Sequence, residues 1–110
     1  MIRRIKACPI LEGEITPPGD KSISHRALIL SSIAEGKAKI SNLSPSTDCL
    51  STLNCLRTLG VETERREISG FPSVVIVSGV GRRGLREAGD VLDAGNSATT
   101  IRLLTGLLAA

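Results

Sequence analysis

The segment Pro17-Pro18-Gly19 divides the sequence into two parts with different patterns. Two consecutive prolines fix the backbone in an extended conformation and remove two amide donors, so the chain is stiff at this point. Before the segment, a weak alternation over residues 2–7 predicts a strand, and residues 10–16 are predicted to form a second one. After it, apolar residues recur at helical spacing from Ile23 onward. The prolines are therefore compatible with a crossing between two domains as well as with a turn.

Beyond Gly19, helices and strands are predicted to alternate, which is typical of an α/β fold. The first helix is expected to begin with Ser22 or Ser24 as its N-cap and to end at Gly36. A second helix is expected from about residue 48 to 59, and a third from about residue 97. The apolar face of the first helix is predicted to consist of Ile23, Ala27, Leu30 and Ala34, widened by Leu28, Ile29 and Ile33. That of the second helix is predicted to centre on Cys49, Leu53 and Leu56. Strands or extended segments are predicted over 38–43, 61–67, 73–78 and 91–94, with loops over 68–72 and 79–89.

The composition limits both the core and the partners. The chain has 110 residues, enough for one small domain, and its only aromatic residue is Phe71, so the core must be built from aliphatic side chains. With a single aromatic residue, a stacking surface for single-stranded nucleic acid is excluded in practice. The net charge of +3 is too small and too scattered to indicate nucleic-acid binding.

The three cysteines, Cys8, Cys49 and Cys55, form neither a disulfide framework nor a zinc motif, because their number is odd and no C-x-x-C pair occurs. We expect small buried side chains in a reducing cytosol. The N-terminus has no apolar stretch typical of a secretory signal, and no run is long enough to span a membrane, so a soluble cytoplasmic protein is expected. The uncapped apolar helix at residues 103–110 favours the N-terminal part of something longer.

The stretch after the prolines could hold an anion. Lys21 and Arg26 are separated by two serines and the first free amides of a helix, a combination that binds phosphate or carboxylate. The stretch is not a nucleotide-binding P-loop, since Asp20 and Ile15 stand where that loop needs glycines. A structural interpretation is also open, in which Lys21 is a solvated charge, the serines are caps and Arg26 pairs with an acidic residue. On this stretch alone the structural interpretation is favoured, and His25 is expected to make only a structural hydrogen bond.

A second stretch near the C-terminus repeats this plan. Gly95-Asn96 is a turn dipeptide, and it is followed by Ser97, Thr99 and Thr100 with Arg102 one turn into a helix. An ordinary helix capped by Asp93 or Asn96 is again the simpler interpretation. Two such helix starts in one short chain nevertheless raise the possibility that both face one pocket.

Both stretches resemble a known family. Residues 18–28 (PGDKSISHRAL) are similar to the N-terminal signature of the 5-enolpyruvylshikimate-3-phosphate synthases, and residues 92–102 (LDAGNSATTIR) look like that family's other N-terminal signature. The spacing between them and the Ser46-Thr47-Asp48 segment fit as well. The resemblance covers essentially the whole chain, so it favours a functional interpretation of both stretches.

The resemblance implies an activity and a fold. The family transfers the enolpyruvyl group of phosphoenolpyruvate to the 5-hydroxyl of shikimate 3-phosphate and releases phosphate, on the way to chorismate, with no metal and no organic cofactor. Its fold has two domains of repeated βαβαββ units with helices inside and sheets outside, forming an inside-out barrel. By resemblance, residues 1–19 provide strands of the first domain and the crossing, and residues 20–110 begin the second domain. The acid–base residues would lie beyond residue 110, so the chain alone is expected to be inactive.

The resemblance also assigns site residues. Lys21, Ser22 and Arg26 would bind shikimate 3-phosphate, and Lys21 with Asn96 and Ala98 would face phosphoenolpyruvate, while no catalytic residue or metal ligand is assigned in this chain. Ala98 replaces the family's usual glycine, a change found in forms that tolerate the longer inhibitor glyphosate, so tolerance is expected.

Two alternatives stay open. In UDP-N-acetylglucosamine enolpyruvyl transferase, a sister enzyme, Lys-Asn occurs at the matching place, whereas Ser22 and Arg26 here favour a phosphorylated shikimate. A non-catalytic phosphate-binding module is the other alternative, and the uncapped apolar end argues against it.

Overall fold

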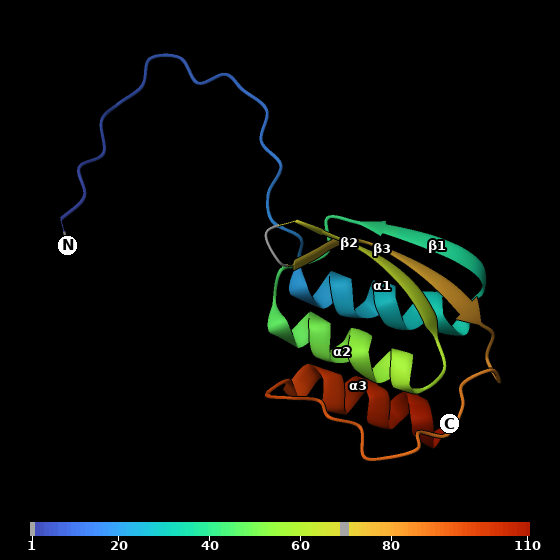
Figure 1. Ribbon diagram of the computed structural model, residues 1–110. Helices are drawn as coiled ribbons and strands as arrows, with labels where there is room; N and C mark the ends of the chain where they lie inside the picture. Colours follow the sequence, from blue (N-terminus) through green and yellow to red (C-terminus); the bar gives the residue numbers. More distant parts are fainter. Residues whose placement is uncertain (1, 69–70) are drawn as a thin grey trace.

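A three-stranded sheet forms one outer layer of the molecule, and helices cover one of its faces (Figure 1). The computed structural model describes residues 2–68 and 71–110. The helices are α1 (Lys21–Ile33), α2 (Thr47–Thr58) and α3 (Ala98–Ala109), and the strands are β1 (Glu35–Ser41), β2 (Glu62–Ile68) and β3 (Phe71–Val80). The order α-β-α-β-β is the one predicted from the sequence.

β3 lies at the centre of the sheet, antiparallel to both neighbours, in the order β1-β3-β2. Val75 and Val77 of β3 are fully buried, and Val77 lies between Ala38 of β1 and Thr63 of β2. β3 takes the central place because its run of β-branched residues suits a strand that is paired on both edges. β1 and β2 are therefore parallel to each other, and α2 connects them across β3.

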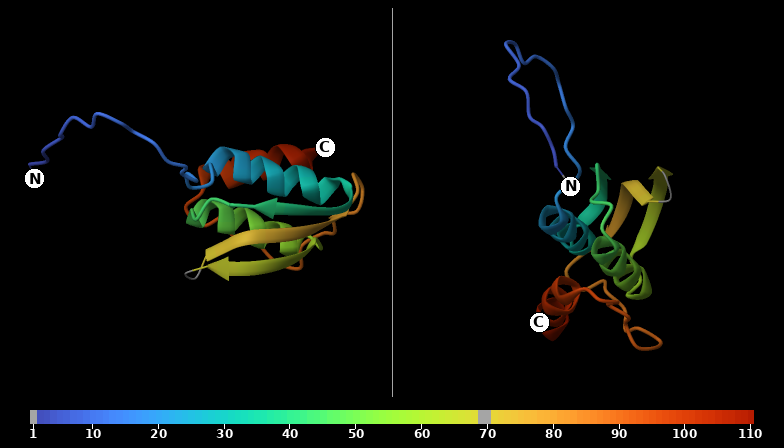
Figure 2. Two further views of the ribbon diagram at one scale, coloured as in Figure 1. Left: turned by 90° about the horizontal axis from the view of Figure 1, so that it is seen from above. Right: turned by 90° about the vertical axis from the view of Figure 1, so that its left-hand side faces the viewer.

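The helices form two layers on the same side of the sheet (Figure 2). α1 and α2 pack between the sheet and α3, and α3 contacts mainly α2. The core between the sheet and the first helix layer includes Leu28 of α1, Leu53 and Leu56 of α2, and the two central valines of β3. As predicted, Cys49, Leu53 and Leu56 form the buried face of α2.

The apolar face predicted for α1 is partly wrong. Leu28 and Ile29 are buried as predicted, but Ile23 and Leu30 are 60% and 61% exposed. The other buried residues of α1 are polar: Ser24, His25 and Ser32. The helix turns its polar Ser24–His25 edge inward, because hydrogen bonds to α2 and to the loop before it satisfy those side chains. Gly36 does not end the helix, since Ala34 is the C-cap and Gly36 lies in β1.

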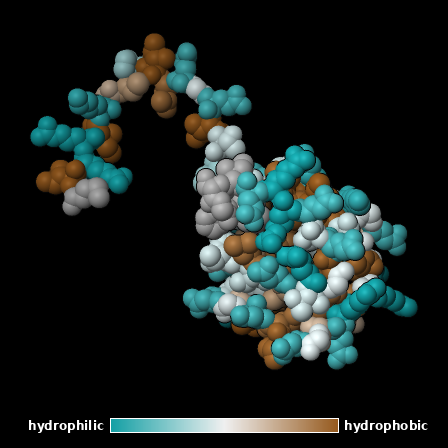
Figure 3. All heavy atoms as spheres, viewed as in Figure 1, coloured by the Kyte–Doolittle hydropathy of each residue, from teal (hydrophilic) through white to brown (hydrophobic). Residues whose placement is uncertain are grey.

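The strands predicted over 2–7 and 10–16 are not formed. Residues 2–20 have no regular secondary structure, residues 2–18 are exposed, and this arm leaves the body of the molecule at the start of α1 (Figure 1). Its isoleucines stay uncovered, with Ile2 94% and Ile5 97% exposed, and Figure 3 shows apolar and charged side chains side by side along it. A strand needs a paired neighbour, and no described segment lies beside the arm.

Two smaller boundaries also differ from the prediction. Of the loop predicted over 68–72, residues 69–70 lie outside the described part, while Ile68 belongs to β2 and both Phe71 and Pro72 belong to β3. Residues 79–80 continue β3, and Leu85 packs partly buried against the core, so the segment 79–89 is not a fully exposed loop. Residues 91–94, predicted only as a short extended segment, lie outside the helices and strands.

Candidate functional site

The three helices run in the same direction, and their N-terminal ends lie at the same side of the molecule (Figures 1 and 2). The arm leaves the body at this side. Each helix start carries free backbone N–H groups and a partial positive charge, so three neighbouring starts favour negatively charged groups. We call residues 19–26, 46–52 and 93–100 the helix-start cluster.

The start of α1 is held tightly against the loop that precedes α2. Asp20, and not Ser22 or Ser24 as predicted, is the N-cap, and its carboxylate accepts a hydrogen bond of 2.7 Å from the N–H of Ile23. Gly19 lies so close to the backbone of Asn42 and Ser44 that a Cβ there would collide with both. Glycine at this position therefore lets the crossing lie flat on the loop.

The serines of α1 have different surroundings. Ser24 is 5% exposed, and its hydroxyl donates to the carbonyl of Asp20 and accepts from the N–H of Ser44 at 2.9 Å. Ser22 and Arg26 are exposed and, being four residues apart, lie on one face of the helix. Among the described residues Arg26 has no ion pair, so the predicted pairing with Asp20 or a glutamate is not formed.

Lys21 forms an ion pair with the start of α2. Its Nζ lies 3.2 Å from Oδ2 of Asp48, with the two side chains 50% and 26% exposed. Ser46 caps α2 and accepts a hydrogen bond from the N–H of Asp48. The Asp48 carboxylate thus stands at a helix N-terminus and close to a cation, and both features stabilise its charge.

The start of α3 is a tight turn followed by a buried cap. Asp93 Oδ1 accepts from the N–H of Gly95, whose φ of 56° is in the left-handed region that favours glycine. Ser97, and not Asp93 or Asn96 as predicted, is the N-cap and accepts from the N–H of Thr100. On either side of this cap, Asn96 and Ala98 are exposed.

A buried row of polar side chains connects the three helices. His25 Nδ1 lies 2.7 Å from Oγ1 of Thr52, and that oxygen lies 2.8 Å from Oγ1 of Thr100. Thr100 also reaches Oγ of Ser97 at 2.7 Å and the carbonyl of Asp48 at 3.3 Å. We call His25, Thr52, Thr100 and Ser97 the buried polar chain. Burial lowers the pKa of His25, the nearby Asp48 carboxylate opposes that shift, and the Lys21 charge adds to it.

The predicted site residues thus fall into two groups around the start of α2. Lys21, Ser22 and Arg26 belong to α1, while Asn96 and Ala98 flank the cap of α3, and the described residues show no direct hydrogen bond between the two groups. The connection runs through Asp48, which binds Lys21 with its side chain and Thr100 with its carbonyl.

Sequence reasoning did not assign a role to Asp48 or Thr52. The available signal was their spacing: Asp48 stands in the first turn of a predicted helix and Thr52 one turn later, on the same face as the buried Cys49 and Leu53. His25 matches its prediction in that its Nδ1 makes a structural hydrogen bond on a helix face.

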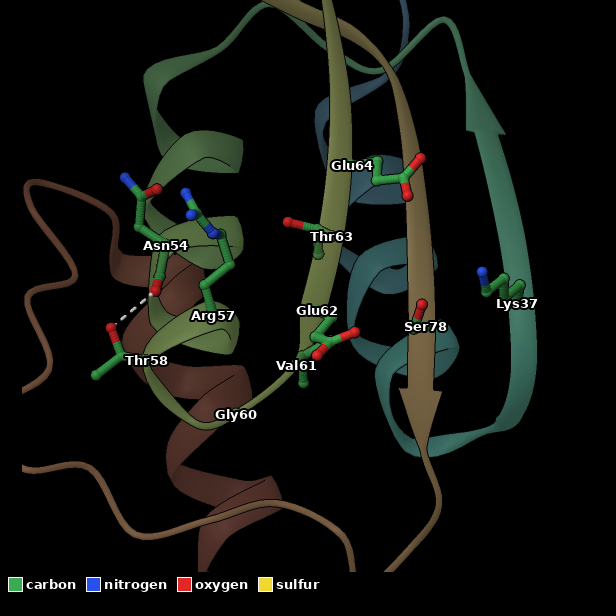
Figure 4. A pocket seen from close by; sticks show the side chains of 10 residues that line it. All are labelled: Lys37, Asn54, Arg57, Thr58, Gly60, Val61, Glu62, Thr63, Glu64 and Ser78. Carbon is green, nitrogen blue, oxygen red and sulfur yellow. Dashed lines mark hydrogen bonds between the residues drawn. The ribbon is translucent and has the colours of Figure 1, made fainter.

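A surface groove lies elsewhere, at the C-terminal end of α2 (Figure 4). Asn54 and Arg57 of α2 lie on one side of the groove, and Thr63 of β2 faces them. The carboxylates of Glu62 and Glu64 lie on the same side as Thr63. The groove mixes both signs of charge, and none of the predicted site residues lines it. It therefore offers less to an anionic ligand than the helix-start cluster does.

The remaining chemistry of the described residues is limited. The predicted burial is confirmed for Cys49 and Cys55, where it raises the pKa of both thiols, and it is wrong for Cys8, which is exposed because the arm packs on no described segment. Within residues 2–68 and 71–110, no group of three histidine, cysteine or acidic residues could hold a metal ion. No helix in the described part of the chain is long and apolar enough to cross a membrane.

Comparison with known proteins gives one consistent family. The sequence model of the family described as EPSP synthase (3-phosphoshikimate 1-carboxyvinyltransferase) matches residues 5–110. A 3-phosphoshikimate 1-carboxyvinyltransferase from Roseiflexus castenholzii is 53% identical over 109 residues, which is 99% of this chain and 24% of that protein. One from Herpetosiphon aurantiacus is 54% identical over 99 residues, which is 90% of this chain and 22% of that protein.

The structural comparison agrees. An EPSP synthase from Acinetobacter baumannii superimposes with a TM-score of 0.81 at 40% identity, over 89% of this chain and 21% of that one. The chain therefore spans about a quarter of the length of the relatives that it matches.

Proposed function

The chain belongs to the EPSP synthase family, and we propose that it supplies one wall of an active site that transfers the enolpyruvyl group of phosphoenolpyruvate to shikimate 3-phosphate. Lys21, Ser22 and Arg26 bind shikimate 3-phosphate in this proposal. Lys21, Asn96 and Ala98 face phosphoenolpyruvate. Both substrates are polyanions, so the first task of the site is to offset their mutual repulsion.

The observation that carries the proposal is the grouping of three helix starts around one lysine. The start of α2 lies between the two groups of predicted ligands, and Lys21 reaches across to it through Asp48. The ammonium group, the free N–H groups and the helix dipoles all favour negative charge at this end of the molecule. The exposure of Ser22, Arg26 and Asn96 leaves these polar groups open to a ligand.

The Lys21–Asp48 ion pair has a defined part in this proposal. Half of the Lys21 side chain is exposed, and an ion pair in such a setting is worth at most about 1 kcal/mol. A phosphate or carboxylate can therefore draw the ammonium away from Asp48 at small cost. Asp48 holds Lys21 near both groups of predicted substrate-binding residues until a substrate binds.

The arm and the domain boundary belong to the same proposal. We infer that residues 1–19 pair with another part of a longer chain, because uncovered isoleucines lie among charged residues there and Pro17 and Pro18 keep the crossing stiff. Residues 20–110 then form the beginning of the second domain, with Gly19 at the hinge. The acid–base chemistry falls to residues outside this chain, and a cytoplasmic location remains a prediction.

Calorimetric titration of shikimate 3-phosphate into the complete protein that carries this chain tests the proposal. We expect Lys21→Ala and Arg26→Ala each to weaken binding about 10- to 100-fold, because each removes a charge-assisted contact. Arg57→Ala is the matched control, since it removes a cation at the opposite end of α2, and it should leave binding unchanged.

Three results would contradict the proposal. One is equal weakening by Arg57→Ala, which would indicate a general effect of charge. Another is unchanged binding in both the Lys21 and the Arg26 variants. The third is binding of UDP-N-acetylglucosamine in place of shikimate 3-phosphate, which would support the sister enzyme instead.

A further inference from the structure

We propose that His25, neutral and protonated at Nδ1, is a positioning residue that sets the turn before α3 through Thr52 and Thr100. The inference rests on the proposed function, because it assigns His25 a role on the phosphoenolpyruvate side of that site. His25 makes no contact with this turn itself. It acts through the buried polar chain.

The first argument is the weak attachment of α3. Only Thr100 and Leu104 of this helix are buried, while Ile101 and Leu103 stay 56% and 39% exposed. A helix with so little buried apolar surface is not placed by apolar packing alone. Its strongest specific connections are the hydrogen bonds of Thr100, which is fully buried, to Thr52, to Ser97 and to the carbonyl of Asp48.

The second argument is a count of donors and acceptors. With the proton on Nδ1, His25 donates to Thr52, Thr52 donates to Thr100, and Thr100 donates to Ser97 Oγ or to the Asp48 carbonyl. In this direction both threonine hydroxyls accept and donate, and Ser97 Oγ accepts from the side chain and the N–H of Thr100. The Nε2 atom, which is buried without a partner among the described residues, is then only an unused acceptor.

The opposite tautomer is worse by the same count. With the proton on Nε2, a buried N–H donor has no acceptor. An orphaned buried N–H is rarer and more costly than an unused lone pair. A charged imidazolium also places an unpaired N–H in the core, next to Lys21, and burial of the ring opposes it. The chain of hydrogen bonds therefore has one direction, from α1 toward α3.

The third argument is where the chain ends. Ser97 is 1% exposed, and it is both the last member of the chain and the N-cap of α3. Asn96 and Ala98 are its direct neighbours in sequence, so a shift of Ser97 moves both residues of the phosphoenolpyruvate side. Lys21, Ser22 and Arg26 lie on α1, which Leu28 and Ile29 also hold in the apolar core, so we expect them to depend less on this chain.

Variants of His25 test which nitrogen matters. Asparagine carries an N–H donor near the position of Nδ1, whereas glutamine carries its amide near the position of Nε2. In the complete protein, we expect His25→Asn to keep KM for phosphoenolpyruvate within about twofold, and His25→Gln and His25→Leu to raise it about tenfold. KM for shikimate 3-phosphate should stay unchanged in all three.

Threonine variants test the path. Thr52→Val and Thr100→Val keep the side-chain shape and should each raise KM for phosphoenolpyruvate, with the double variant no worse than the poorer single one. Thr58→Val is the matched control, because within the described part of the chain its exposed hydroxyl bonds only the carbonyl of Asn54 at the far end of α2. It should have no effect.

The tautomer can be measured without activity. In protein labelled with ¹⁵N-histidine, the signals of His25 are assigned as those that disappear in His25→Asn. Their ¹⁵N chemical shifts should show a protonated Nδ1 and an unprotonated Nε2. A protonated Nε2, rescue by glutamine rather than asparagine, an equal rise in both KM values, or additive threonine effects would each overturn the inference.

Failure of the proposed function would look different. If the complete protein does not transfer the enolpyruvyl group, KM for phosphoenolpyruvate cannot be measured. The labelled histidine and a double-variant cycle of Thr52 and Thr100 on the urea-unfolding free energy then decide whether the chain of hydrogen bonds exists. Additive unfolding effects or a protonated Nε2 would reject the inference in that case.

Discussion

Asp20 at the start of α1 and Ser97 at the start of α3 do the same local work, since each side chain accepts a hydrogen bond from an N–H of the first turn. Their surroundings differ. α1 packs against the sheet and buries five residues, while α3 lies on the outer layer and buries two. One half of the proposed site is thus held by the apolar core and the other half by a few polar contacts. We therefore expect mutations at these two similar helix starts to lower stability by different amounts.

The largest expected effect contrasts the apolar contacts of the two helices. Leu28→Ala in α1 should lower the free energy of unfolding by about 2–5 kcal/mol, because it leaves a cavity in a fully buried site. Leu103→Ala in α3 should cost less than about 1 kcal/mol, because that side chain is 39% exposed. Urea unfolding of both variants measures the difference. Equal costs would mean that α3 is packed as firmly as α1.

The next contrast compares the two caps. Asp20→Ala removes an exposed cap and should cost about 0.5–2 kcal/mol. Ser97→Ala should cost about 1–3 kcal/mol, because it also leaves the buried hydroxyl of Thr100 with a poorer partner. Hydrogen exchange should place the loss at the amides of α3 in the second variant. A loss spread evenly over α1 and α3 would contradict the separate anchoring of the two starts.

A smaller effect is expected from pH. Burial lowers the folded-state pKa of His25 below its value in the unfolded chain, about 6.5, so the unfolded chain binds the proton more readily. Stability is therefore full above that value and is lost as the pH falls through it toward the folded-state pKa. In the wild type, the urea midpoint should decrease as the pH is lowered across this window.

His25→Asn provides the control for that measurement, since His25 is the only histidine of the chain. The variant should lose the part of the slope near the histidine pKa and keep the part due to carboxylates at lower pH. An unchanged slope would show that His25 does not supply it.

The smallest effect on the fold is expected at the exposed ligand side of α3. Ala98→Gly should cost less than about 1 kcal/mol of stability, because Ala98 is exposed at the first position of the helix. In the complete protein it should lower the inhibition constant of glyphosate about 10- to 100-fold, since a methyl group in the way of the longer inhibitor is removed. KM for phosphoenolpyruvate should change little. An unchanged inhibition constant would reject the expected tolerance.

Much of the fold was predictable because local patterns carried it. The helix of residues 47–58 and the strand around Val74–Val77 follow from spacing and from β-branched composition, and both occur where expected within a few residues. The caps were harder, because Asp20, Ser22 and Ser24 all have suitable side chains, and only the path of the chain over Asn42–Ser44 selects Asp20.

The sequence by itself determined the alternation of helices and strands, the aliphatic core, the two sequence motifs at helix starts and the family. Only the tertiary structure decided that Lys21 pairs with Asp48, that His25 bonds Thr52, and that Thr100 of α3 bonds the same threonine. These partners lie 27 or 48 residues apart. Local patterns specify which face of a helix is apolar, but the pairing of polar groups depends on how whole helices pack, because a buried donor or acceptor must find its partner wherever the fold provides one.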